Sequence, residues 1–392
     1  MMVRRLLSVL IFTGVALAAP VTAVADTSPP NQVLSNYENS TGNSIARDCG
    51  FSQSLPGKHG DSLWLFCDTP VYGFKDKKWQ LLSFITGSTA AEGPVTPGKV
   101  PTRLSELTKA GTALPKFPNN HAPQRFLTVP SRLLTRTGGT CGGNSKSYAA
   151  SWIYGVTRDA ARPSDLLISF DNFCVQGALT FTPEGFGLAV YDPANNTVVS
   201  HTVYTARAGL SAPRVLGSPV FSGSYLYLFG FRCADPGLVC PASSQDAVYL
   251  ARVRASLSDT AGDYQWYVRP GVWSRSPGAA KSVIPDARPL GGVNVGDFSS
   301  LGQGLVMIEQ TSIGGGFTVY EASSPAGPWR AKTTGTVPCG SGGTGLCHAL
   351  IPHADLSTRG KLLISFFNPA ATPYYHPSQA PSGHLEVAAF SW

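Results

Sequence analysis

Charged residues are scarce in this sequence, and long apolar runs are absent after its first 25 residues. Asp, Glu, Lys and Arg make up 14% of the 392 residues, and the formal net charge is +7. No run of Lys or Arg stands out, so a nucleic-acid partner is not expected. No later segment is long and apolar enough to span a bilayer. Helix signals are also rare, and the best of them covers 102–110.

Several catalytic and metal-binding motifs are missing. There is no Gly-x-Ser-x-Gly elbow, so a Ser-His-Asp triad is not supported. No Cys-x-x-Cys occurs and no Cys/His cluster has zinc spacing, which argues against a structural zinc site. The Gly-rich stretch 138–143 lacks the Lys and following helix of a phosphate loop. We therefore expect no cofactor, and the sequence leaves a structural calcium ion open.

The first 25 residues have the pattern of a secretory signal. Arg4 and Arg5 precede an apolar stretch over 6–19, and Ala23-Val24-Ala25 is a small-x-small cleavage site. We expect a secreted, extracellular protein that starts near Asp26 and acts as a monomer. Eight cysteines suit disulfides in that setting. Many pairings are possible, and the simplest is sequential: Cys49–Cys67, Cys141–Cys174, Cys233–Cys240 and Cys339–Cys347.

Five similar segments rich in Leu, aromatic and β-branched residues recur along the chain, at 61–68, 165–172, 224–231, 303–310 and 361–368. Each precedes a second strand-like run, at 78–85, 185–192, 246–253, 315–322 and 384–391. Repeated hairpins with flanking strands predict an all-β fold, a five-bladed β-propeller in a single domain over 26–392. A β-sandwich or jelly roll is the alternative. A long insertion over 86–145, rich in Gly, Pro, Ser and Thr, interrupts the repeat.

The stretch from Arg47 to Tyr72 carries the strongest chemical signal. If Cys49 and Cys67 bond across two antiparallel strands, the constant index sum of opposed residues places Asp48 opposite Asp68. Two facing carboxylates are costly unless a substrate, a cation or a shared proton requires them. Glycoside hydrolysis needs such a pair, one carboxyl as acid and the other as nucleophile or base. Asp48 and Asp68 are therefore our candidate catalytic residues.

Polar residues also end several of the repeated strands. When the repeats are superposed, equivalent positions hold Asp68, Asn172, Phe231, Gln310 and Asn368. Around one axis these side chains could line a polar cavity, although Asn and Asp also favour simple turns. His348 and His353 flank a strand-like segment before the fifth repeat and could bind sugar hydroxyls, orient a carboxylate or approach a central cation. We take Asn172, Gln310, His348, His353 and Asn368 as candidate substrate-binding residues.

A family resemblance rests on motifs spread over most of the chain. Residues 48–50 and 66–69 resemble the paired Asp-Leu-Gly and Phe-Gly-Asp-Thr signature of a secreted bacterial propeller family, with Cys at the Leu and second Gly positions. Residues 323–329 resemble its Gly-Pro-Trp motif, and 353–357 with 363–366 resemble its late His-Pro-Glu-Leu-Ser and Leu-Val-Ser-Tyr stretch. That family, formerly a domain of unknown function, is related to endo-D-arabinanases that cut mycobacterial cell-wall arabinan. The resemblance implies a five-bladed propeller with Asp48 and Asp68 in the catalytic roles.

The sequence thus predicts a secreted glycoside hydrolase that uses a pair of aspartates, with a polysaccharide as its partner. The expected substrate is arabinan or a related furanose-rich cell-wall polymer, cut in an endo fashion. A non-catalytic carbohydrate-binding propeller and an exo-acting glycosidase are the alternatives. The sequence does not identify the sugar linkage, the anomeric outcome or which aspartate is the acid.

Overall fold

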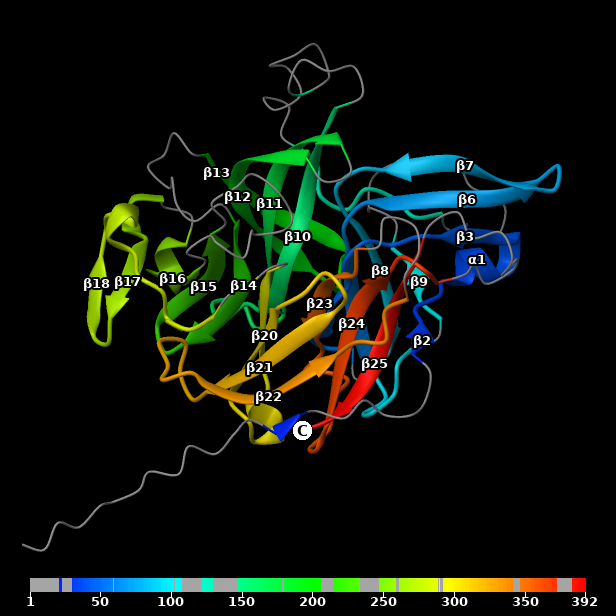
Figure 1. Ribbon diagram of the computed structural model, residues 1–392. Coiled ribbons are helices and arrows are strands. Elements are labelled where there is room, and N and C mark those ends of the chain that lie inside the picture. Colours follow the sequence, from blue (N-terminus) through cyan, green and yellow to red (C-terminus); the bar gives the residue numbers. More distant parts are fainter. Residues whose placement is uncertain are drawn as a thin grey trace, which may run out of the picture.

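The computed structural model describes residues 21–22, 30–58, 60–101, 103–107, 122–129, 141, 147–177, 180–205, 215–232, 247–258, 261–287, 289, 292–340, 346–371 and 383–392. Over these ranges the fold is nearly all-β (Figure 1). The helices described there are α1 (Asn36–Thr41) and four 3-10 turns, η2 (Ala255–Leu257), η3 (Ala261–Asp263), η4 (Pro277–Ala279) and η5 (Ser299–Leu301). Within the same ranges no helix is long and apolar enough to cross a membrane.

Five sheets of four or five strands follow one another along the chain. The first holds β4 (Phe51–Ser54), β5 (Asp61–Phe66), β8 (Thr89–Pro94) and β9 (Ser105–Glu106). The second holds β10 (Tyr148–Arg158), β11 (Leu166–Gly177), β12 (Thr180–Asp192) and β13 (Thr197–Thr205). The third holds β14 (Val215–Ser222), β15 (Tyr225–Arg232), β16 (Ala247–Arg254), β17 (Gln265–Arg269) and β18 (Val272–Ser274).

The fourth and fifth sheets each recruit a short strand from the beginning of the chain. The fourth holds β19 (Val293–Asp297), β20 (Leu305–Gln310), β21 (Gly316–Ala322) and β22 (Arg330–Thr336), with β1 (Val21–Thr22) parallel to β22. The fifth holds β23 (His348–Pro352), β24 (Lys361–Asn368) and β25 (His384–Ser391), with β2 (Asn31–Gln32) antiparallel to β25. Apart from Val21 and Thr22, the predicted signal peptide lies outside the described residues.

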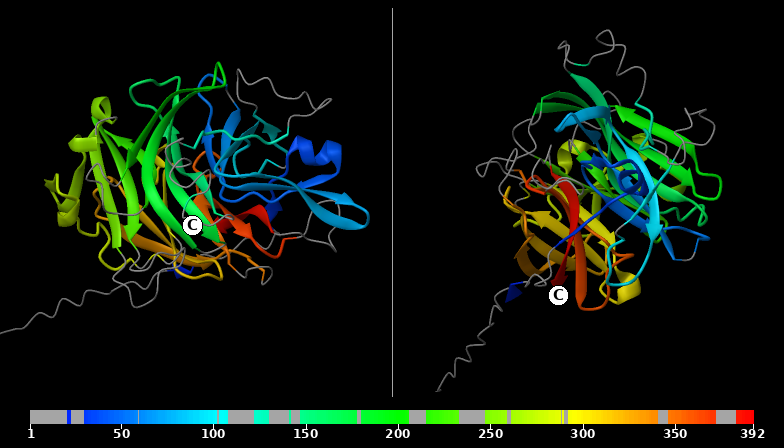
Figure 2. Two further views of the ribbon diagram at one scale, coloured as in Figure 1. Left: turned by 90° about the horizontal axis from the view of Figure 1, so that it is seen from above. Right: turned by 90° about the vertical axis from the view of Figure 1, so that its right-hand side faces the viewer.

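Consecutive sheets pack face to face, and a separate apolar cluster fills each interface. Leu63 and Phe170 belong to the cluster between the first and second sheets. The next three interfaces contain clusters that include Leu188 with Leu228, Leu250 with Met307, and Phe317 with Phe366. A fifth cluster packs Trp64 against Leu363 and Leu385, so the last sheet lies against the first. In both views of Figure 2 the orange and red strands of the last sheet lie beside the blue strands of the first.

The first strands of the sheets lie innermost. β10 contacts both β4 and β14, while β19 contacts both β14 and β23. Fully burying a large apolar side chain contributes about 1.5–3 kcal/mol, so these interfaces are the main source of stability. Residues at the beginnings of different inner strands can therefore meet, although they lie far apart in the sequence.

A sixth, three-stranded sheet stands apart from the other five. It consists of β3 (Asn43–Ile45), β6 (Thr69–Lys75) and β7 (Lys78–Ile85). We expected 78–85 to pair with 61–68, but β5 pairs with β4 and β8 instead. β8 comes from the predicted insertion, and its buried Ala90 and Ala91 pair with Leu65 and Trp64 of β5. The hairpin of β6 and β7 extends away from the five sheets (Figure 1).

Other expectations can also be compared with the structure. The remaining four repeated hairpins are antiparallel pairs, as predicted. The helix expected over 102–110 is wrong where the chain is described, because Ser105 and Glu106 form strand β9. Three of the four predicted disulfides are confirmed, namely Cys49–Cys67, Cys141–Cys174 and Cys339–Cys347. The fourth, Cys233–Cys240, lies outside the described residues.

Candidate functional site

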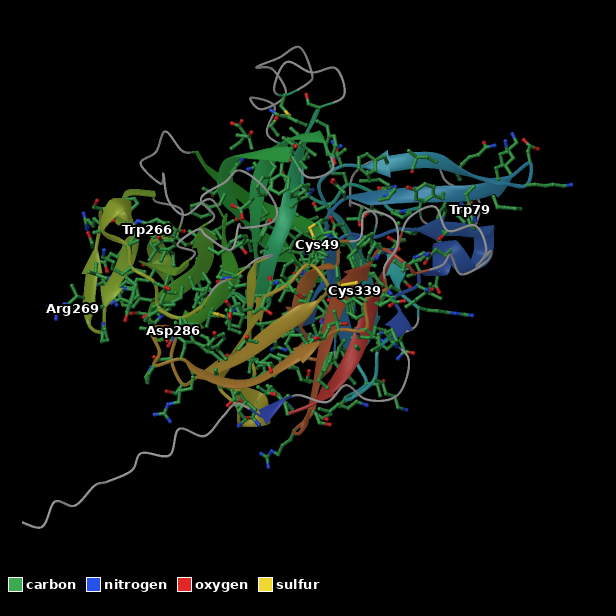
Figure 3. All side chains as sticks on the ribbon, in the orientation of Figure 1. Cys49, Trp79, Trp266, Arg269, Asp286 and Cys339 are labelled. Atoms are coloured by element: carbon green, nitrogen blue, oxygen red, sulfur yellow. A yellow bond between two sulfur atoms is a disulfide. The ribbon has the colours of Figure 1, made fainter. Side chains whose placement is uncertain are left out.

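Asp48 and Asp68 face each other across the first two strands of the first sheet. The register of β4 and β5 pairs Phe51 with Leu65, and the same index sum joins Asp48 to Asp68. The backbone N–H of Asp48 donates to the carbonyl oxygen of Asp68 at 3.1 Å, which extends the pairing to these residues. The disulfide between Cys49 and Cys67, with Cα atoms 5.5 Å apart, ties the two strands together beside them. Figure 3 places Cys49 near the middle of the molecule.

The ladder is irregular at Cys49, which has a φ of 45°. Few residues other than glycine adopt this left-handed conformation, and it interrupts the alternation of a regular strand. The turn allows the Asp48 carboxylate to accept a hydrogen bond from the N–H of Cys49 at 2.8 Å. Simple alternation along an extended strand therefore does not describe where the Asp48 side chain lies.

Asp68 is a buried carboxyl group held by two donors. The residue is 7% exposed. The hydroxyl of Tyr148 donates to Oδ2 at 2.6 Å, and the N–H of Gly87 donates to Oδ1 at 2.7 Å. Burial raises the pKa of Asp68 to about 6, against these two bonds that lower it, and the charge of Asp48 adds to the rise. Asp68 therefore keeps a proton at a pH where an ordinary aspartate has lost it.

The pKa of Asp48 is shifted in the opposite direction to that of Asp68. Oδ1 of Asp48 accepts a hydrogen bond from Nε2 of His348 at 2.8 Å, and its side chain is 33% exposed. Burial would raise the pKa of Asp48, but the charge and hydrogen bond of His348 outweigh it and hold the pKa below its usual value. The two carboxyl groups thus have pKa values pushed apart, the arrangement that separates an acid from a base.

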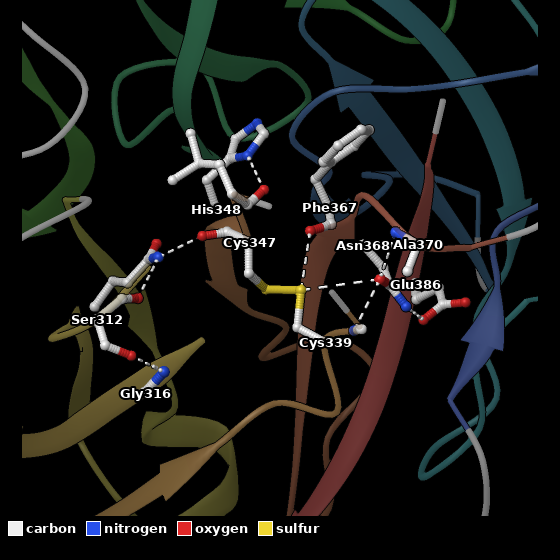
Figure 4. Close-up of a disulfide and its surroundings, with 12 residues drawn as sticks. Ser312, Gly316, Cys339, Cys347, His348, Phe367, Asn368, Ala370 and Glu386 are labelled. Atoms are coloured by element: carbon white, nitrogen blue, oxygen red, sulfur yellow. Dashed lines mark hydrogen bonds between the residues drawn. A yellow bond between two sulfur atoms is a disulfide. The ribbon is translucent and has the colours of Figure 1, made fainter. Parts of the chain in front are cut away.

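His348, the first residue of β23, is held by the strands around it. Nε2 of Gln310 donates to the carbonyl of Cys347 at 2.6 Å and to that of Ser312 at 2.9 Å. Figure 4 shows these bonds beside the Cys339–Cys347 disulfide, with Asn368 on its other side. Asn368 accepts from the N–H of Gly340 and donates to Glu386 at 2.8 Å.

Of the predicted substrate-binding residues, one contacts the aspartate pair and three are buried amides. His348 joins the aspartate pair directly. Gln310 and Asn368 are 3% and 7% exposed and support the chain around His348. Asn172 is fully buried in the second sheet, where its Oδ1 accepts from the hydroxyl of Ser151 at 2.6 Å. A direct contact between these three amides and a substrate stays a prediction that their burial does not favour.

His353 lies away from the pair, beyond the other end of β23. Its Nδ1 is 2.7 Å from the hydroxyl of Ser52, and its ring packs on Trp64 with centroids 4.9 Å apart. Burial lowers the pKa of His353 to about 3, so this ring is neutral. His348 and His353 thus lie at opposite ends of β23, and a substrate-binding role for His353 stays a prediction.

Two residues of the site were not anticipated from the sequence. Tyr148 opens β10 and reaches Asp68 from the second sheet. Gly87 has a φ of 97°, and a Cβ there would lie 3.1 Å from the backbone nitrogen of Ser151. A glycine is needed at this close approach, which brings its N–H to Asp68. Neither residue belongs to a recognisable motif, and only the packing of the first sheet on the second joins them to the pair.

A cavity of about 430 Å³ lies toward the other end of the inner strands, away from the aspartate pair. Residues from all five sheets line it, including Ser52, Val156, Pro219, Asn294 and Ile351. In the part of the chain that the structure describes, no three His, Cys, Asp or Glu residues gather in a way that could hold a metal ion.

Comparison with protein families adds an independent finding. Residues 149–378 match the model of a family described as a domain of unknown function, DUF5005. The chain belongs to the DUF5005 family. The matched region of this DUF5005 protein includes His348 but begins after Asp48, Asp68 and Tyr148. No curated protein matches the sequence significantly.

Solved structures resemble this DUF5005 protein over most of its length. A protein of Bacteroides ovatus, described as a candidate hydrolase, has a TM-score of 0.57 at 17% identity and covers 90% of this chain and 88% of its own. A family 117 glycoside hydrolase of Zobellia galactanivorans has a TM-score of 0.46 at 12% identity, covering 95% and 90%. The GH43_1 enzyme of Xanthomonas citri in complex with xylose has a TM-score of 0.45 at 12% identity, covering 88% and 87%. The first of these likenesses shows a shared fold.

Proposed function

We propose that this protein is a glycoside hydrolase in which Asp68 is the general acid and Asp48 is the base or nucleophile. The observation that carries the proposal is the pair itself, opposed across one ladder with pKa values displaced in opposite directions. Glycoside hydrolysis needs one carboxyl group that holds a proton and one that has lost it. His348 on one side and burial on the other supply that difference.

In the reaction, Asp68 gives its proton to the oxygen of the leaving sugar as the glycosidic bond breaks. Asp48 then acts in one of two ways. It takes a proton from the attacking water, or it attacks the anomeric carbon and forms an ester that water later hydrolyses. Separations between the carboxyl groups of ~5–5.5 Å suit the second route and ~6.5–9.5 Å the first. The anomer released first, read by NMR, distinguishes them.

We further propose that the five sheets are the blades of a five-bladed propeller, with the aspartate pair near its axis. The proposed substrate is arabinan or another furanose-rich cell-wall polysaccharide, cut within the chain by a secreted enzyme. The motif resemblance to endo-D-arabinanases, the leader pattern of residues 1–25 and the disulfides support this proposal.

The decisive experiment compares the wild-type chain with Asp68→Asn on a panel of arabinans, with products separated by chromatography. We expect a ladder of oligosaccharides from the wild type and a loss of about 10²–10⁴-fold in the variant, the usual contribution of a general acid. Release of monosaccharide alone would indicate an exo-acting enzyme. Binding without cleavage, equal in both proteins, would indicate a carbohydrate-binding module.

A further inference from the structure

The β6–β7 hairpin carries an unusual concentration of exposed apolar side chains. Leu81, Leu82 and Phe84 are 56%, 54% and 42% exposed. Elsewhere in the described residues, large exposed apolar side chains occur singly, as at Val199 and Ile313. A contiguous apolar patch on a protein surface marks an interaction site more often than isolated residues do.

An irregularity in the ladder brings Leu81 and Phe84 to one face, whereas Leu82 packs over Gly73 on the other. Phe84 pairs with Pro70 and Leu81 pairs with Tyr72, and the register shifts between these pairs. Pro70 and Tyr72 are two residues apart and lie on one face of β6, so Phe84 and Leu81 share that face. Further out, the same face carries Trp79, which Figure 3 labels on the hairpin. The result is one apolar and aromatic face.

This face is continuous with the aspartate pair. The ring of Phe84 stands edge-on to the ring of Tyr148, with centroids 5.5 Å apart. The hydroxyl of Tyr148 donates to Asp68 at 2.6 Å. Since a strand rises about 3.3 Å per residue and the partners Pro70 and Tyr72 are two residues apart, Leu81 lies roughly 7 Å beyond Phe84, away from the acid. A chain resting on this face would have one of its units beside Asp68.

We propose that the face formed by Phe84, Leu81 and their neighbours on β6 binds the polysaccharide next to the point of cleavage. The inference rests on the proposed glycosidase function and adds a substrate-binding surface to it. Sugar rings present C–H faces that stack on apolar and aromatic side chains. The hairpin binds several consecutive units of a long chain, and a short oligosaccharide reaches only the part nearest Phe84.

The test uses Leu81→Ala and Phe84→Ala, singly and together, with Val199→Ala and Ile313→Ala as matched controls. We expect kcat/KM on mycobacterial arabinan to fall about tenfold in the double variant, which corresponds to about 1.4 kcal/mol of binding. Leu81→Ala should lower kcat/KM on the polymer more than on a short arabinofuranosyl oligosaccharide. The controls should cleave both substrates as the wild type does.

Affinity electrophoresis of the same variants in the Asp68→Asn background measures arabinan binding without hydrolysis. If the wild type cleaves arabinan and the double variant cleaves and binds it equally well, the hairpin inference is overturned and the glycosidase proposal stands. If the wild type neither cleaves nor binds any glycan, the glycosidase proposal itself fails. A concentration-dependent dimer that Leu81→Ala abolishes, with cleavage unchanged, would show that the face joins two copies of the chain.

Discussion

His348 donates Nε2–H to Oδ1 of Asp48 at 2.8 Å, while its Nδ1 lies 3.2 Å from the carbonyl oxygen of Leu346. Both partners of the imidazole are oxygen acceptors, so the contacts favour the doubly protonated, cationic form of the ring. Burial would lower the pKa of His348, but the charge of Asp48 and these two hydrogen bonds raise it above its usual value. The pair is a charged link between the fifth sheet and the first.

Replacing His348 with Gln removes that cation. The pKa of Asp48 should then rise, because burial is no longer opposed. The acidic limb of the pH–activity profile should move to higher pH by about one unit or more, the usual effect of a close opposite charge. Steady-state rates between pH 3 and 8 measure it. A His353→Gln control, whose ring contacts Ser52, should leave this limb in place. An unmoved limb in His348→Gln would mean that Asp48 is not the base.

Replacing Tyr148 with Phe should change the alkaline limb of the pH–activity profile. Activity requires protonated Asp68 and is lost as the pH rises through its pKa of about 6. The Tyr148 hydrogen bond lowers that pKa, so its removal should move the alkaline limb upward by about one unit, since a bond to a charged group contributes about 1.5 kcal/mol. Tyr264→Phe, whose hydroxyl donates to Ser258 instead, is the control. A downward shift would contradict the assignment of Asp68 as acid.

The disulfide beside the pair should matter for stability. It closes a loop with a sequence separation of 18 residues. The double variant Cys49→Ser with Cys67→Ser should lose about 3 kcal/mol of unfolding free energy in urea titrations, since the unfolded chain is no longer constrained. It should also lower activity, because these cysteines adjoin both aspartates. A variant as stable as the wild type would show that the ladder alone holds the two strands.

Arg47, which precedes Asp48, is buried with Glu106 as an ion pair and lies 4.0 Å above the ring of Phe66. Arg47→Met leaves Glu106 buried without its cation, which typically costs about 3–5 kcal/mol. Adding Glu106→Leu to this variant should recover much of the loss. Urea unfolding of both variants measures the difference. If the single and double variants are equally unstable, the loss comes from packing rather than from an unpaired charge.

The sequence predicted the strands of four sheets well because their apolar residues are buried between neighbouring sheets. Phe170, Phe229, Ile308 and Phe366 are each at most 2% exposed, as strands with strong β signals should be. For the first sheet, the sequence predicted the wrong partner for the strand over 61–68. β7 has the stronger β signal, yet Leu81 and Leu82 are exposed, whereas β8 pairs with β5 despite its small residues. The β propensity of a segment does not determine which other strand it pairs with.

The aspartate pair was predictable because an assumed Cys49–Cys67 disulfide fixes which residues of the two antiparallel strands lie opposite each other. The rest of the site was not, since Tyr148 and Gly87 reach Asp68 only through the packing of two sheets. The short helix α1 did carry a local signal. Ser35 and Glu38 form a capping box, the Ser-x-x-Glu spacing, before it.

The pairing of β2 with β25 sets an order on folding during synthesis. Asn31 pairs with Val387 and Gln32 with Glu386, so β2 cannot take its place in the sheet until β25, which is made later, is available. Until β25 has been made, the fifth sheet lacks an inner strand, and Leu385 is not yet there to pack with Trp64 of the first sheet. For the secreted enzyme that we propose, this delay leaves the unclosed polypeptide free to be threaded through a translocation channel.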